Sequence, residues 1–185
     1  MSGVVLVEVV AVTVLATVLA FCLSAAEAAL QRMTRVRAEE LADDGRVGSA
    51  ALVAVVDQPA PYLAVLAFLR VVAEAATAVL ITVAVIAVTD SLGKALAISI
   101  LVMALVSFVL VGVSPRTLGR QNYERAALVA APVARVLRRV LGPISHGLIA
   151  LGNAVTPGKG YRDGPFQTES ELRDLLDQAS DSSVI

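Results

Sequence analysis

The chain has 185 residues, of which 57% are hydrophobic and 17% charged, and its formal net charge is −1. A soluble domain of this length does not need so much apolar surface, so the composition argues against a soluble protein and indicates a membrane protein. A chain so close to neutral also offers no electrostatic support for a nucleic-acid partner, which requires a marked excess of Lys and Arg.

Three apolar runs have the length of about 20 helical residues that a bilayer core requires. They predict membrane spans at about residues 4–26, 62–88 and 95–113. The runs are continuous, whereas a membrane β-strand alternates between apolar and polar residues over about ten positions, so helices are favoured over a barrel. The predicted fold is an all-α membrane protein with three transmembrane helices.

The first run has an alternative interpretation as a secretory signal, because Ser24-Ala25-Ala26 is similar to a cleavage site of small residues. No Lys or Arg precedes the run, Glu8 lies near its start, and it exceeds the usual signal core of about 7 to 15 residues. We therefore expect a retained span.

Basic residues are concentrated in two segments, one after the first predicted span and one after the third. Arg32, Arg35, Arg37 and Arg46 follow the first span, Lys94 alone separates the second and third, and all later basic residues follow the third. The positive-inside rule then predicts an N-terminus outside the cell and a cytoplasmic tail, in a multi-pass protein of the cell membrane.

Arg70 and Glu74 lie within the second apolar run, four residues apart and hence on one helix face. Charges at membrane depth are costly and mark an ion pathway, a substrate site or a pair inside a bundle. Glu27, at the inner end of the first span, is a further expected partner of Arg70. This charge network requires the guanidinium of Arg70 to lie within about 6 Å of the carboxylate of Glu27 or Glu74.

A second candidate site lies at Gly112-Val113-Ser114-Pro115, because proline removes a backbone donor and breaks a helix. The freed carbonyls need another partner at membrane depth, and such backbone is tolerated where protein covers it or where it lines a wet cavity. The alternative is a simple helix terminus at Ser114-Pro115, with Arg116 extending to the membrane surface.

The tail is predicted to begin with juxtamembrane amphipathic helices at about residues 122–140 and 141–155, separated at Gly142-Pro143. The first carries four arginines and suits the anionic inner leaflet, which makes membrane lipid a partner. Residues 1–155 then form the transmembrane domain, residues 156–167 a linker, and residues 168–185 the start of a cytoplasmic helical region. Because that helix is barely complete at Ile185, we expect a longer polypeptide.

Few residues suit enzymatic chemistry, since the chain has one cysteine, Cys22, and one histidine, His146. A single cysteine excludes an intrachain disulfide. No nucleophile, base and oxyanion constellation is recognisable, so we expect no enzyme.

Four motifs in order resemble the transmembrane domain of the CNNM/CorC family of magnesium transporters, also labelled haemolysin-like. The stretch from Phe21 to Leu30 is similar to its F-x-S-x-S-E-T-A-L signature, and Pro115-Arg116-Thr117 resembles its P-K-T. Asn122 to Arg125 resembles N-P-E-R, and Thr168 to Arg173 resembles T-E-E-E-L-R.

The resemblance implies a homodimer of three-span protomers, a juxtamembrane belt and a cytoplasmic CBS-pair module in the full-length chain. It also implies Mg²⁺ transport with Na⁺ as the coupling ion. Magnesium prefers oxygen ligands in octahedral array, so the candidate ligands are the Ser24 hydroxyl, the Glu74 carboxylate and the backbone carbonyl of Gly112.

The departures from the family pattern concern this ion site. Arg70 and Glu74 stand where the family tends to carry an Asn-x-x-x-Asn pair, and Gly112 stands where it carries an acidic residue. Arginine offers only donors and cannot ligate a cation. We therefore expect a cation transporter with an altered, weakened site, or a transport-inactive paralogue that acts as a scaffold or regulator. An unrelated membrane-anchored module is the remaining alternative.

Overall fold

A computed structural model describes residues 3–155 of the chain, except for the side chains of residues 143–146 and 148–155. The linker and the cytoplasmic helix predicted from residue 156 onward lie outside the described residues, as do the side chain of His146 and the motif at Thr168–Arg173.

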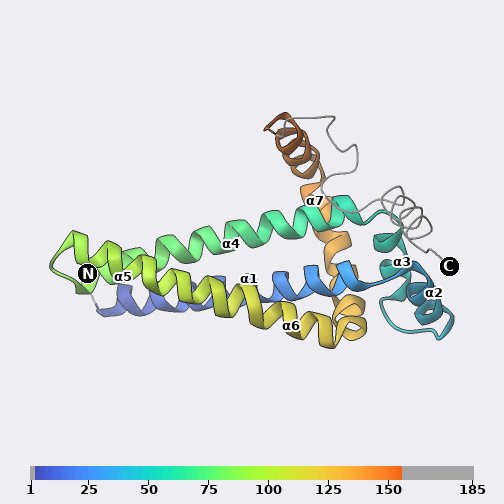
Figure 1. Cartoon of the computed structure of the whole chain (residues 1–185), viewed down its shortest axis with the longest axis horizontal. Coiled ribbons are helices and arrows are strands. Elements are labelled where there is room, and N and C mark those ends of the chain that lie inside the picture. The colour runs from blue at the N-terminus through green and yellow to red at the C-terminus, as the bar shows by residue number, and fades with distance from the viewer. Residues whose placement is uncertain (1–2, 156–185) are drawn as a thin grey trace, which may run out of the picture.

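Three long helical segments form the body of the molecule, as Figure 1 shows. They are α1 (Gly3–Arg32), α4 (Pro59–Val88), and a third that runs without a break through α5 (Leu92–Leu105), η1 (Val106–Val113) and α6 (Ser114–Gln121). Each is 30 residues long and apolar enough to cross a membrane. The prediction of an all-α fold with three transmembrane helices is therefore confirmed for the described part of the chain.

The third helix does not end at Pro115, where the sequence led us to expect a break. It changes instead from α-helical to π-helical hydrogen bonding over η1, where the amide of Ser114 donates to the carbonyl of Val109. Pro115 lies in the first turn of α6, where a missing backbone donor is tolerated. The irregularity thus precedes the proline, as a π-helical segment within a continuous helix.

Two short helices, α2 (Arg35–Asp43) and α3 (Ser49–Asp57), lie at the end of the bundle opposite the N-terminus. Thr34 caps α2 by accepting a hydrogen bond from the amide of Arg37. Gly48 has a φ of 90°, and a Cβ there would lie 2.3 Å from the carbonyl oxygen of Leu128. Only glycine satisfies both the left-handed backbone and this close approach.

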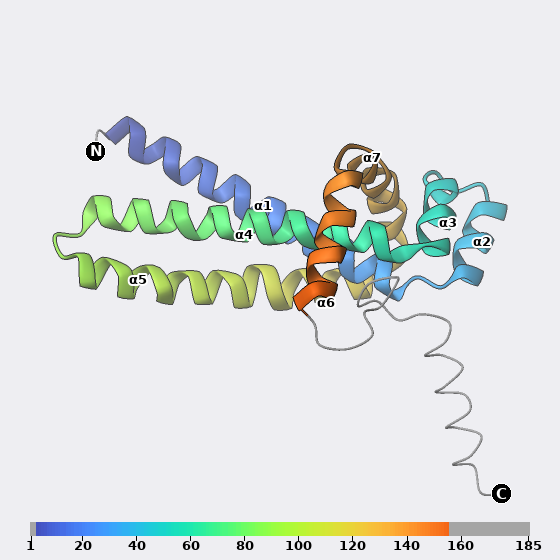
Figure 2. The ribbon, with the colours of Figure 1, turned by 90° about the horizontal axis from the view of Figure 1, so that it is seen from above.

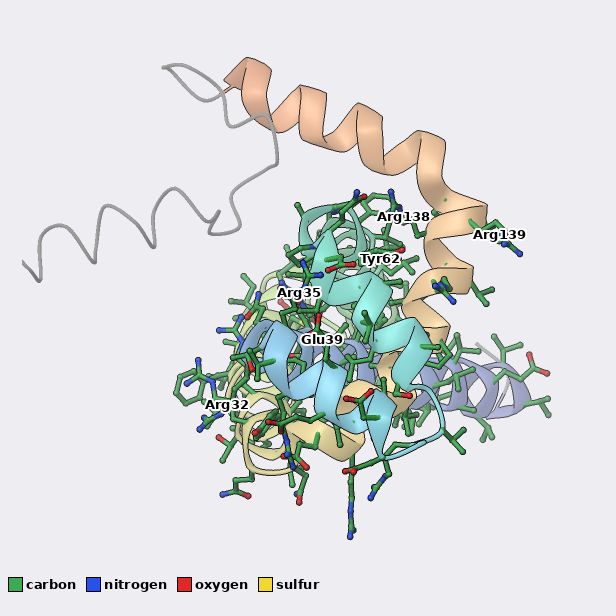
Figure 3. The ribbon with its side chains drawn as sticks, turned by 90° about the vertical axis from the view of Figure 1, so that its right-hand side faces the viewer. Arg32, Arg35, Glu39, Tyr62, Arg138 and Arg139 are labelled. Atoms are coloured by element: carbon green, nitrogen blue, oxygen red, sulfur yellow. The ribbon has the colours of Figure 1, made fainter. Side chains whose placement is uncertain are left out.

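The juxtamembrane region is one helix, α7 (Tyr123–Val155), and not two helices separated at Gly142-Pro143. Figure 3 shows α7 changing direction just beyond Arg139. Pro143 accounts for this bend, because its ring clashes with the preceding turn and it cannot donate a backbone hydrogen bond. The proline therefore kinks the helix without ending it, and α7 crosses the spans toward the end of the bundle opposite the N-terminus (Figure 2).

The main hydrophobic core lies where α1 and α4 meet α2, α3 and α7. Leu52, Val55 and Leu66 are almost completely buried there, and Ala127, Ala131 and Ala134 of α7 are fully buried. The small alanine side chains let α7 approach the bundle closely. This core fixes the C-terminal part of α1 and the N-terminal part of α4, which carry the candidate site.

Candidate functional site

Three helices meet at a point where small side chains allow close contact. Ala20 of α1, Ala73 of α4 and Val111 of η1 form a separate buried cluster. Small residues at such a crossing let the helix backbones approach, which is the usual basis of helix packing in membranes. Groups of all three spans are therefore within reach of one another here.

Ser24 lies one turn beyond Ala20 on α1 and is 2% exposed. Its hydroxyl donates a hydrogen bond of 2.7 Å to the carbonyl oxygen of Val111. The bond joins the first span to the π-helical segment of the third, four residues before Pro115.

Arg70 of α4 joins the carboxylates of two helices. Its Nε donates to Oε2 of Glu27 on α1 at 3.1 Å, and its Nη1 donates to Oε1 of Glu74 at 2.7 Å. The side chains are 18% exposed for Arg70, 15% for Glu27 and 25% for Glu74. The structure therefore brings the three charges together in one largely buried network, with a formal charge of −1 in total.

The level of this network in the membrane follows from helix length. Arg70 precedes Val88, the last residue of α4, by 18 residues, which corresponds to about 27 Å at 1.5 Å per residue. The hydrocarbon core is about 30 Å thick. If α4 begins to cross at Val88, the charges lie close to the other boundary of the bilayer, where α7 crosses the bundle.

The three predicted metal ligands have different surroundings, and the side chains of two of them already form hydrogen bonds. The Ser24 hydroxyl bonds to Val111 and the Glu74 carboxylate bonds to Arg70. Gly112 lies in η1, where a Cβ would approach the carbonyl oxygen of Ser107 to 3.1 Å. Among the described residues, no group of three His, Cys, Asp or Glu side chains is arranged to hold a metal ion. Every buried side-chain nitrogen or oxygen in this part of the chain has a hydrogen-bond partner.

The sequence did not indicate that the Val111 carbonyl is the hydrogen-bond partner of Ser24. Pro115 indicated only that the helix is irregular nearby, since a proline removes a backbone donor. What the sequence lacked was the π-helical path of η1 and the crossing with α1. These place that carbonyl, and not that of Gly112, against the serine.

A second group of ion pairs lies outside the spans, between α2 and α7. Arg37 Nε donates to Oε1 of Glu124 at 2.8 Å, and the phenol of Tyr123 contacts the same oxygen at 3.3 Å. The hydrogen bond from Arg37 holds the pKa of Glu124 below its ordinary value of 4.5. The same carboxylate raises the pKa of Arg37. The guanidinium of Arg32 lies 5.5 Å from the ring centroid of Tyr123, so both α1 and α2 are joined to the start of α7.

Comparison with known proteins agrees with this architecture. The model of the cyclin M (CNNM) transmembrane N-terminal domain family matches residues 11–185. UPF0053 proteins of Mycobacterium bovis and Mycobacterium tuberculosis are each 40% identical to this chain over 162 residues. The alignment covers 88% of the chain and 37% of each relative. The chain thus spans well under half the length of these relatives.

Proposed function

The chain belongs to the CNNM transmembrane family, and on this premise we propose that it is the membrane domain of a cation transporter with an altered ion site. Mg²⁺ is the proposed substrate and Na⁺ the proposed coupling ion. The domain acts in the cell membrane as a homodimer, with its basic end and tail in the cytoplasm and a CBS-pair module in the full-length protein.

The observation that carries the altered site is the bridge from Arg70 to Glu27 and Glu74. A guanidinium cannot ligate a cation, because it has donors only and keeps its charge. At about 4 Å it would also repel a bound divalent ion by several kcal/mol, even at an effective dielectric constant near 20. Arg70 therefore competes with a cation for both carboxylates.

Cation binding at this place requires Arg70 to release one carboxylate. Glu74 is the better candidate ligand, because Arg70 can stay paired with Glu27 on the neighbouring helix. The Ser24 hydroxyl and the backbone carbonyls of η1, including that of Gly112, would supply neutral oxygens from the adjacent span. Carboxylate, hydroxyl and carbonyl oxygens are the ligands that Mg²⁺ accepts. Magnesium affinity at this site is then lower than with a neutral amide at position 70.

The second candidate function is a transport-inactive paralogue that acts as a membrane scaffold or regulator. It is favoured by the same network, in which Arg70 partners two carboxylates and the Ser24 hydroxyl is also engaged. In that function the ion pairs hold α1 and α4 together and no ion passes. Under either function we expect the chain to have no enzymatic activity.

A flux measurement separates the two functions. The full-length protein is reconstituted into vesicles that contain a magnesium-sensitive or a sodium-sensitive dye, and the wild type is compared with a variant carrying Arg70→Asn and Glu74→Asn. The matched control is Arg35→Asn with Glu39→Asn, which removes an ion pair of the same spacing at 2.8 Å on the exposed α2.

An altered transporter gives measurable Mg²⁺ flux in the wild type, increased flux in the double variant, and no change in the control. A wild type without flux and a double variant with flux support the inactive paralogue. If neither folded protein carries Mg²⁺ or Na⁺, the transporter proposal is wrong. A loss of strong wild-type flux in Arg70→Ala, with folding intact, would contradict the view that Arg70 weakens the site.

A further inference from the structure

The helix α7 has two apolar faces, and the bundle covers only one of them. Its alanine face packs into the core. On another face, Val129, Val133, Val136 and Val140 have exposures of 72%, 52%, 63% and 70%. These valines follow one another at intervals of four, three and four residues, so they form one continuous stripe along the helix. We refer to these four residues as the valine stripe.

Positive charge accompanies the valine stripe on one side. Arg135 and Arg139 are exposed and directly precede Val136 and Val140, which places them about 100° around the helix from those valines. Arg125 is exposed one turn before Val129. Glu124 is the only acidic residue in the α7 sequence, and Arg37 already bonds to it. The exposed surface of α7 is thus apolar and cationic.

The fourth arginine of this region has a different role. The guanidinium of Arg138 lies 4.5 Å from the ring centroid of Tyr62 on α4. Figure 3 shows Arg138 directed toward Tyr62, whereas Arg139 points away from the bundle. A cation–π contact of this kind fixes the rotation of α7 about its axis. The structure therefore assigns one arginine to packing and leaves the valine stripe directed away from α4.

The position of α7 matches the boundary of the bilayer. It crosses the spans instead of continuing along them, as Figure 2 shows. Tyr62, its contact on α4, precedes Arg70 by eight residues, or about 12 Å of helix. On the arginine side, the Leu128 carbonyl and the Pro132 side chain approach Gly48, just before α3. The arginine side of α7 therefore faces Gly48 and the start of α3, and the valine stripe, about 100° around the helix, stays exposed.

We propose that the valine stripe, together with Arg125, Arg135 and Arg139, is a docking surface for the anionic phospholipids of the surrounding leaflet. Valines buried at the acyl boundary, with arginines reaching the headgroups, reproduce the geometry of a helix lying in the membrane interface. Charge complementarity selects anionic headgroups. A second copy fits less well, because a two-fold contact through this face would bring its arginines together without carboxylates.

Tryptophan fluorescence tests this proposal directly, because the chain contains no tryptophan. A single Val136→Trp reporter is placed in the whole chain, in vesicles of phosphatidylcholine and phosphatidylglycerol in which either lipid is brominated. Val140→Trp is a second reporter, in case the first disturbs folding. Phe108→Trp, 68% exposed on η1, and Val47→Trp, 93% exposed between α2 and α3, are the membrane and water controls.

We expect both reporters on the valine stripe to be quenched, and more strongly by brominated phosphatidylglycerol than by brominated phosphatidylcholine. Each of Arg125→Gln, Arg135→Gln and Arg139→Gln should reduce this preference about five-fold at low salt, from the usual contribution of a basic residue near an anionic surface. Phe108→Trp should be quenched without headgroup preference, and Val47→Trp should not be quenched.

Three results would overturn the proposal. The first is quenching of Phe108→Trp without quenching of either stripe reporter, which means that water or another protein surface covers the stripe. The second is a phosphatidylglycerol preference that is absent in the wild-type background or unchanged when all three arginines are replaced. Loss of quenching on increasing the protein-to-lipid ratio would assign the face to a second copy instead.

Discussion

The two ends of the helical bundle differ in how closely their side chains pack. Toward the N-terminus, α1 diverges from α4 (Figure 2), and side chains such as Val7, Leu15 and Val88 are each 69% exposed. At the opposite end, Leu52 is fully buried and Leu66 is 1% exposed. The half that contains the N-terminus needs only length and apolarity to remain in a bilayer, whereas the opposite end depends on specific contacts between side chains.

This difference shows where sequence changes should matter. Among the described residues, the side-chain hydrogen bonds that join separate spans are those of Ser24 with Val111 and of Arg70 with Glu27, and both lie in the half of the bundle farther from the N-terminus. In the half nearer the N-terminus, the hydroxyl of Thr82 bonds to a carbonyl of its own helix, that of Ala78. Matched substitutions at the two ends therefore test the comparison.

The largest expected effect comes from glycines at the two ends. A Cβ at Gly119 would lie 2.4 Å from the carbonyl oxygen of Ala25, so Gly119→Ala forces α6 away from α1. We expect a destabilisation of about 2 kcal/mol, within the range for overpacking. At Gly93, just after the turn between α4 and α5, a Cβ meets nothing within 4 Å. There the same change should be neutral or stabilising by up to about 1 kcal/mol.

Unfolding of both glycine variants in the same detergent, followed by circular dichroism, checks this prediction. Equal stabilities would mean that α6 does not pack on α1 as closely as the structure shows.

A smaller effect is expected for the Ser24 hydroxyl that joins α1 to η1. Ser24→Ala leaves the buried Val111 carbonyl without its partner, at a cost of about 1 to 2 kcal/mol. Thr82→Val removes a hydroxyl that bonds only within its own helix, and should change the free energy of unfolding by less than about 0.5 kcal/mol. Thermal unfolding of the two variants in parallel is the measurement. A Ser24→Ala protein as stable as Thr82→Val would show that η1 satisfies its own carbonyls.

The smallest expected effect is a pH dependence of local stability where α2 contacts the start of α7. The Arg37 hydrogen bond lowers the folded pKa of Glu124 below 4.5, so the stabilisation is complete above the unfolded pKa and is lost as the pH falls through the folded one. Hydrogen exchange of the first turns of α7 should therefore increase on acidification below about pH 4.5. Glu124→Gln should remove this dependence. A pH response that persists in Glu124→Gln would assign it to another group.

Much of the fold could be predicted from local patterns, because in a bilayer a long apolar run has a low free energy only as a helix. The three spans, the short turn after Val88 and the amphipathic start of α7 all follow from this constraint. The predictions for Ser114-Pro115 and Gly142-Pro143 were less accurate. Both prolines lie inside continuous helices, since packing and π-helical hydrogen bonding absorb the distortion that a proline imposes.

The candidate site was predictable in its members but not in its connections. The spacing of Arg70 and Glu74 indicated their pairing, and Glu27 was expected at the same level. The simultaneous bond from Arg70 to Glu27 depends on the crossing of α1 and α4, which alanines permit. The same crossing places the hydroxyl of Ser24, a predicted ligand, within hydrogen-bond distance of the Val111 carbonyl.

The sequence by itself determined that this chain is a helical membrane protein with three apolar spans, because a backbone in hydrocarbon must satisfy its own hydrogen bonds and a helix does so within each span. Only the tertiary structure decided which charges meet, which carbonyl receives the serine hydroxyl, and which face of α7 remains open. These outcomes depend on helix crossings tens of residues apart in the chain, and local sequence patterns do not encode the angle at which two helices cross.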